Sequence, residues 1–143
     1  MNQTTVNLKS RPADEIIGDQ YMSRWHLRRK KGRHNLYLLH RYVGSDDDRA
    51  LHDHPWKSIG VVLWGKLYEV TESGERRLWP WLPKYRSAYY SHRLRLKSDY
   101  ALTLFFTFPK EREWGFHCPK GWVHWREFTD KSGRKTGAGC GED

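Results

Sequence analysis

The chain has 143 residues, which is enough for one domain with a hydrophobic core of its own. Its formal net charge of +9 attracts anions such as nucleic acid or phosphorylated metabolites, although such a charge also serves solubility. No apolar run is long enough to span a membrane, so we expect no membrane association. Aromatic residues make up 15% of the chain, and Trp and Tyr spaced by turn residues favour β structure over a helical bundle.

The first twenty residues are polar and mixed, and we expect a short N-terminal arm over 1–20. This arm is either loose or contains a short helix from about Pro12 to Gly18. The first residues lack the basic-then-apolar pattern of a secretory signal. With only Cys118 and Cys140 in the chain, this predicts a cytoplasmic protein without a disulfide.

Two strands are expected before the middle of the chain. Residues 21–27 alternate loosely and predict an edge strand, and residues 35–43 predict a second strand of better quality. His40 in the second strand is more simply a satisfied core or rim histidine than a fourth site residue. The basic run between the strands is either a solvated turn or a phosphate-binding loop, and includes Arg28, Arg29, Lys30 and Lys31.

The centre of the chain carries two histidines two residues apart, His52 and His54. In an extended strand, side chains i and i+2 point to the same face, so both imidazoles point into one space and can bind one metal ion. A β-type run follows, then a turn at 64–66 that predicts a hairpin with 67–71 as the return strand.

This stretch resembles the first motif of the cupin superfamily. The His52/His54 pair is followed by Pro55, and Gly65 stands where that motif has its glycine, but Ser58 stands in the place of its glutamate. The second motif of that superfamily is represented by His92 alone. The resemblance covers about residues 35–108 and implies a small antiparallel barrel whose mouth often holds a divalent metal, often in a homodimer.

The second half of the chain predicts two further strands and a closing hairpin. In 89–96, His92 shares a face with two leucines, and in 100–108 four apolar residues line one side of the strongest predicted core strand. Residues 114–125 contain His117, Cys118 and His124, which make a poor zinc pattern, so we interpret the segment as an aromatic hairpin. Residues 129–143 are polar and Gly-rich and predict a flexible tail.

The predicted fold class is therefore all-β: a single antiparallel cupin-type jelly-roll barrel over 21–128, with the N-terminal arm before it and the flexible tail after it. The candidate metal ligands are His52, His54 and His92, with Glu69 as the nearest carboxylate that could replace the missing glutamate. The alternative interpretation, which we favour slightly, is that Glu69 is a cross-strand partner of a basic residue. Such ligands suit Fe, Mn, Ni or Zn. The candidate anion-binding residues are Arg41, Arg93, Arg28, Arg29, Lys30 and Lys31.

Two functions of different classes follow. The first is a metal-binding barrel that acts as an oxygenase-type or isomerase-type enzyme on a small anionic molecule. The second is a non-catalytic binding module for nucleic acid or another polyanion, supported by the charge and the aromatic content. The sequence does not decide whether the protein is an enzyme, because a fold does not dictate an activity.

Overall fold

The computed structural model describes residues 11–19, 21–29, 36–46 and 50–141, with the side chains of 28, 29 and 36–38 left undescribed. The described residues form twelve strands and one short helix, and every strand pairing is antiparallel. The strands are β1 (Glu15–Ile17), β2 (Met22–Arg29), β3 (Leu36–Tyr42), β4 (Leu51–His52), β5 (Ser58–Trp64), β6 (Leu67–Thr71), β7 (Gly74–Leu78), β8 (Lys84–Arg86), β9 (Arg93–Leu96), β10 (Ala101–Thr107), β11 (Gly115–Cys118) and β12 (Gly121–His124); α1 spans Trp125–Phe128.

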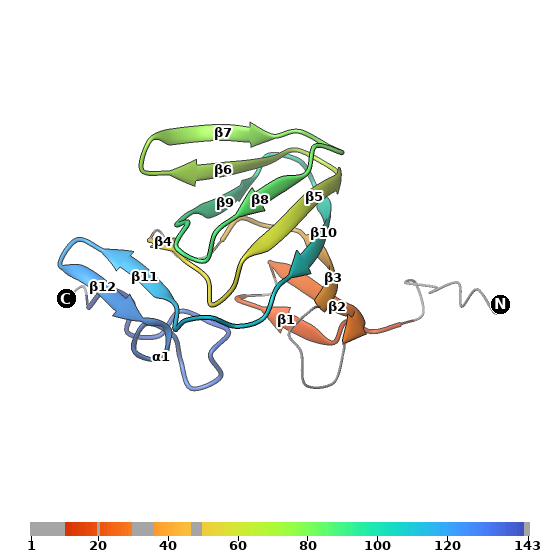
Figure 1. Cartoon of the computed structure of the whole chain (residues 1–143). Helices are drawn as coiled ribbons and strands as arrows, with labels where there is room; N and C mark the ends of the chain where they lie inside the picture. The colour runs from red at the N-terminus through yellow and green to blue at the C-terminus, as the bar shows by residue number, and fades with distance from the viewer. Residues whose placement is uncertain (1–10, 20, 30–35, 47–49, 142–143) are drawn as a thin grey trace.

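The strands build the two walls of a jelly-roll barrel. One wall is a six-stranded sheet with the order β1-β2-β3-β10-β5-β8. The other consists of two three-stranded sheets, β7-β6-β9 and β12-β11-β4, which an isolated bridge between His52 and His92 connects. In Figure 1, β6 and β7 lie at the top, and the β11–β12 hairpin lies at the lower left, away from β1 and β2. The predicted all-β barrel is confirmed, and no helix among the described residues is long and apolar enough to cross a membrane.

The core lies between the two walls, and burial alternates along the central strands as a two-sided sheet requires. In β10 the buried residues are Ala101, Thr103, Phe105 and Thr107, whereas Leu102, Leu104 and Phe106 on the opposite side are only partly buried. The side that the sequence marks as the more apolar is therefore the outer one. On the inner side, Ala101 belongs to the core cluster, and the Phe105 ring lines the cavity described below and stacks on His40 at 5.2 Å.

The bounds of β6 agree with the predicted return strand, and β5 covers the predicted β-type run, but the two strands do not form a hairpin. β5 pairs with β10 and β8, whereas β6 pairs with β7 and β9 in the other wall. The connection crosses between walls at Gly65, whose φ is +97°. A Cβ at this position would lie 2.4 Å from the carbonyl oxygen of Tyr100, so only glycine allows this close approach.

Replacing Gly65 with alanine is expected to lower the free energy of unfolding by more than about 1 kcal/mol, since alanine suits neither the positive φ nor the contact with Tyr100. Gly74 is a matched control, because its φ of +123° is also positive but a Cβ there meets no atom within 4 Å. Chemical denaturation of both variants measures the difference. Equal losses for G65A and G74A would contradict the role of the close approach.

The N-terminal region differs from its prediction. Residues 15–17 form β1 rather than a helix, which agrees with the two β-branched residues Ile16 and Ile17. β1 pairs with β2, so β2 lies inside the six-stranded sheet and is not an edge strand. Residues 1–10 of the predicted arm lie outside the described residues.

The C-terminal segment, predicted as a flexible tail from residue 129, is held against the barrel through residue 141. The amide of Gly18 donates to the carbonyl of Arg134 at 2.8 Å, and the amide of Gly137 donates to the carbonyl of Phe128 at 3.0 Å. Cys118 in β11 and Cys140 form a disulfide across 22 residues. The prediction of no disulfide is wrong, because a count of two cysteines does not reveal that β11 brings Cys118 beside the returning chain.

Replacing Cys140 with serine is expected to lower the free energy of unfolding by about 3 kcal/mol, the loop-closure value for a loop of this size. The measurement is urea denaturation of the variant beside the oxidised protein. Reductant should destabilise the parent protein by a similar amount and leave the variant unchanged. A parent protein insensitive to reductant would contradict a structural role for the crosslink.

Candidate metal centre

Three histidine side chains converge between the two walls of the barrel. His52 comes from β4, His54 follows two residues later, and His92 directly precedes β9. Their ring centroids form a nearly equilateral triangle, with 5.1 Å between His52 and His54 and 5.0 Å from each of these to His92. One ring nitrogen of each histidine lies within 4.8 Å of the corresponding nitrogens of the other two. The structure therefore brings together the three histidines that the sequence selects.

The backbone explains this convergence. The amide of His52 donates to the carbonyl of His92 at 2.9 Å, and the amide of His92 donates to the carbonyl of His52 at 3.0 Å. Residues paired directly in an antiparallel bridge project their side chains to the same face. His54 lies two residues beyond His52, so it joins them on that face.

Glu69 lies behind His92 and not beside the other two histidines. Its Oε1 is 2.6 Å from Nδ1 of His92, and the carboxylate is fully buried. It also accepts hydrogen bonds from Nε of Arg86 at 2.8 Å, from the Tyr90 hydroxyl at 2.9 Å and from Nζ of Lys84. Of the two interpretations of Glu69, metal ligand and partner of a basic residue, the contacts of its carboxylate agree with the second.

Electrostatics keep Glu69 ionised. Burial raises the pKa of the Glu69 carboxyl, but the hydrogen bond from His92, the charge of Arg86 and the hydrogen bond from Lys84 outweigh burial and lower this pKa below its ordinary value. An ionised carboxylate only accepts hydrogen bonds, so Nδ1 of His92 carries the proton and donates it. The lone pair of His92 is then on Nε2, which is the form that a metal ligand needs.

The other two histidines are also suited to bind a metal. Burial, which disfavours the charged imidazole, lowers the pKa of His52, lowers that of His54 well below its ordinary value, and lowers that of His92 to about 3. All three rings are therefore neutral near pH 7, the state that coordinates metals. Nδ1 of His54 is buried and has no hydrogen-bond partner among the described residues, which a metal ion would supply.

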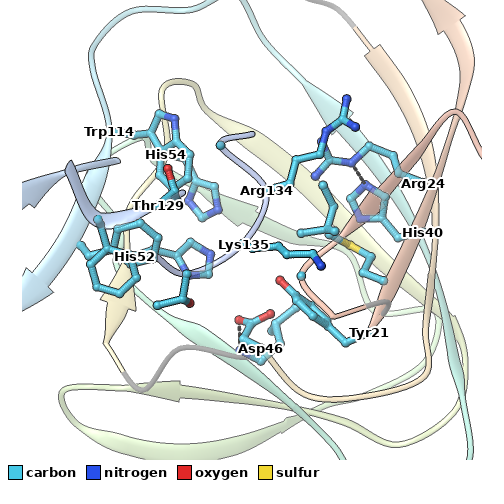
Figure 2. A pocket seen from close by; sticks show the side chains of 18 of the residues that line it. Tyr21, Arg24, His40, Asp46, His52, His54, Trp114, Thr129, Arg134 and Lys135 are labelled. Carbon is cyan, nitrogen blue, oxygen red and sulfur yellow. Dashed lines mark hydrogen bonds between the residues drawn. The ribbon is translucent and has the colours of Figure 1, made fainter. Parts of the chain in front are cut away.

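The triad borders a cavity of about 300 Å³ inside the barrel. Figure 2 shows His52 and His54 on one side of this cavity, near Trp114, and Arg24, His40 and Arg134 on the other. Aromatic side chains make up much of its lining, namely Trp56, Phe105, Trp114, Phe116 and Phe128. Three histidines in such a cavity leave coordination positions open toward an apolar chamber with a charged far side.

The two predicted anion-binding arginines whose side chains the structure describes, Arg41 and Arg93, lie away from the cavity. Arg41 is exposed and stacks over the Tyr100 ring at 5.5 Å, and neither Arg41 nor Arg93 lines the cavity. The backbone of Arg28 and Arg29 belongs to β2, but their side chains are not described. Lys30 and Lys31 lie outside the described residues.

The second cluster of histidine and cysteine has structural partners. Asp53 points away from the triad and is buried, and its carboxylate accepts from the Gly115 amide at 2.9 Å and contacts His117 Nε2 at 3.0 Å. Cys118 is in the disulfide, and His124 contacts Glu113 at 3.0 Å. His117, Cys118 and His124 lie in the predicted hairpin, whose strands are β11 and β12, and belong to no cluster of possible metal ligands among the described residues.

Sequence reasoning missed the cations of the far wall, Arg24 from β2 and Arg134 and Lys135 from the C-terminal segment. His40, which it weighed as a possible fourth site residue, lines the cavity and accepts a hydrogen bond from Arg24. Alternation in β2 could have suggested Arg24. No local pattern places Arg134 and Lys135 at the cavity, because their position depends on the fold of the C-terminal segment onto the barrel.

Comparison of the sequence with protein-family models found no match, and comparison with curated proteins found none. Comparison with solved structures found similar folds. A cupin superfamily protein from Desulfitobacterium hafniense DCB-2 has a TM-score of 0.53 at 14% identity, over 67% of this chain and 84% of that one.

Two named enzymes are also similar in fold. DMSP lyase DddQ from Ruegeria pomeroyi DSS-3 has a TM-score of 0.56 at 18% identity, over 71% of this chain and 54% of the lyase. Fe(II)-HppE, bound to the alternative substrate (S)-1-HPP, has a TM-score of 0.55 at 17% identity, over 70% of this chain and 57% of HppE. The match therefore spans little more than half the length of either enzyme. This chain has a cupin-like fold.

Proposed function

We propose that this cupin-like barrel binds one divalent metal ion through His52, His54 and His92 and uses it in catalysis on a small anionic molecule. The observation that carries the proposal is the triangle of three neutral imidazoles at the cavity, with Glu69 behind His92. The Fe(II) in HppE, whose fold is similar, supports iron among the metals that such ligands suit.

The chain's own residues define what the site does. The Glu69 carboxylate fixes the tautomer and orientation of His92, a role that such outer carboxylates have in metal sites. Trp114 and Phe116 border the triad and keep the chamber apolar, which strengthens electrostatic interactions within it. A bound metal would polarise an oxygen of the substrate at its open positions.

Elemental analysis tests this proposal. We expect about one Fe, Mn, Ni or Zn per chain in protein purified without a histidine tag, and none in the H52A/H54A double variant. His124 is a matched control, because it lies on the β11–β12 hairpin outside the triad, and H124A should keep its metal. Circular dichroism establishes that each variant is folded. Equal metal contents in the parent and the double variant, including none in either, would contradict the proposal.

The alternative function, binding of nucleic acid or another polyanion, is favoured by an exposed aromatic and basic surface. Trp79, Trp81 and Tyr85 are more than half exposed, and the Arg77 guanidinium stacks over Trp79 at 4.1 Å. Bases stack on such rings between cations. Binding to single-stranded DNA that weakens steeply with salt would support this function, and no binding at low salt would remove it.

Two further expectations stay predictions. A homodimer is tested by light scattering during size-exclusion chromatography. The cytoplasmic location is tested by fractionation of the source cells. One of the two arguments for it was the expected absence of a disulfide, which the Cys118–Cys140 crosslink contradicts.

A further inference from the structure

The wall of the cavity that faces the histidine triad is rich in cations. Arg24, Arg134 and Lys135 line it, and Asp46 is the only carboxylate among the described lining residues. Figure 2 shows Arg24 and Arg134 near one another, with Lys135 extending across the cavity toward Tyr21. Glu15 and Asp19, which do not line the cavity, pair with these cations, so the positive charges on the lining itself attract an anion into the cavity.

Glu15 holds the two guanidinium groups from outside the cavity. Its carboxylate is 3.0 Å from NH1 of Arg24 and 4.0 Å from NH2 of Arg134. Nε of Arg24 donates to Nε2 of His40 at 3.1 Å. Nε and Nη1 of Arg24 are therefore held by His40 and Glu15. A guanidinium oriented in this way is prepared to bind a carboxylate or phosphate oxygen.

Hydrogen bonds hold the backbone of the C-terminal segment in place at Arg134 and Lys135. The Arg134 carbonyl accepts from Gly18 at 2.8 Å, and the Lys135 carbonyl accepts from the Asp130 amide at 2.9 Å. Thr136 bridges Thr129, and the disulfide at Cys140 closes the segment. The side chains are half exposed, and Lys135 pairs with the exposed Asp19 at 3.3 Å, a contact that a stronger ligand can replace.

We propose that Arg24, Arg134 and Lys135 form an oxyanion subsite that holds a carboxylate or phosphate group of the substrate while another part of the molecule reaches the histidine triad. This inference rests on the proposed function and specifies its substrate class: a small organic oxyanion that fits a cavity of about 300 Å³. The C-terminal segment is thus part of the proposed binding site.

Isothermal titration calorimetry with inorganic phosphate, and separately with succinate, tests the subsite and distinguishes phosphate from carboxylate. In the R134Q/K135Q double variant, affinity for whichever probe binds should fall about tenfold or more, because two charge-assisted hydrogen bonds are lost. The matched control is K131Q, because Lys131 is an exposed cation of the same segment that does not line the cavity. Its affinity should stay within about twofold of the parent.

The subsite proposal is wrong if neither phosphate nor succinate binds the parent protein. It is also wrong if K131Q and the double variant lose the same affinity, because equal losses would indicate diffuse attraction to the basic surface. Metal content measured on the same preparations keeps the two proposals separate. Loss of probe binding in R134Q/K135Q from metal-free protein would establish the subsite even if the triad binds no metal. If the metal content and the probe affinity of that variant both equal those of the parent, the metal-site proposal stands and the subsite proposal is wrong.

Discussion

Glutamine in place of Glu69 is expected to weaken metal binding about 10- to 100-fold and to lower the free energy of unfolding by about 3–5 kcal/mol. The amide oxygen can still accept from His92, but the weaker acceptor lowers the basicity of the ring and frees its orientation. The stability loss has another cause. Arg86 is 3% exposed and pairs with Glu69, so the substitution leaves a buried guanidinium without its counter-ion.

Metal titration by calorimetry and urea denaturation of metal-free protein measure the two effects separately. Glu75 offers a matched control on the same three-stranded sheet, because it also pairs with two cations, Arg95 and Lys97, but at the surface. E75Q should leave metal affinity and stability nearly unchanged. An E69Q protein with the metal affinity of the parent would show that Glu69 does not support His92.

Acidification is expected to destabilise the metal-free protein well before its carboxylates titrate. Burial lowers the pKa of His40 and His54 well below the ordinary value of 6.5 and lowers that of His92 to about 3. In the unfolded chain these rings take up protons as the pH falls through 6.5, whereas in the native protein they stay neutral. The unfolded state then binds more protons, so the free energy of unfolding decreases as pH decreases.

Each strongly shifted histidine contributes about 1.4 kcal/mol per pH unit once the pH is below 6.5. The three together predict a loss of about 4 kcal/mol between about pH 7.5 and about pH 5.5. Urea denaturation across this range, in the presence of a chelator, measures the slope, and NMR of the imidazole protons reports which rings stay neutral. A flat stability profile, or native rings that titrate near pH 6.5, would contradict the buried neutral histidines.

Much of the barrel could be predicted from the sequence because strand residues alternate locally. The bounds of β5, β6 and the β11–β12 hairpin follow from apolar runs and turn residues. Strand pairing could not be predicted in the same way. Whether β5 and β6 form a hairpin or cross between walls depends on the close approach of Gly65 to Tyr100, which are far apart in sequence.

The site shows the same division between local and long-range information. His52 and His54 are recognisable from their spacing, and His92 from its strand. The role of Glu69 depends on two other segments: β8, which carries Lys84 and Arg86, and the residue before β9, His92. Only the tertiary structure therefore distinguishes a carboxylate behind a metal ligand from a metal ligand. For the C-terminal segment, a Gly-rich composition typical of disorder predicts a flexible tail, whereas the disulfide and backbone hydrogen bonds that join it to the barrel depend on residues far away in the sequence.

The most direct test of the metal centre is a crystal structure of the protein grown with Fe(II), Mn(II) or Zn(II), with anomalous data collected at the edge of that metal. We expect one anomalous peak at about 2.0–2.2 Å from Nε2 of His92 and from one nitrogen each of His52 and His54. The Glu69 carboxylate should still accept the hydrogen bond from Nδ1 of His92. A triad without a peak, or a peak coordinated by Glu69 in place of a histidine, would contradict the proposed metal centre.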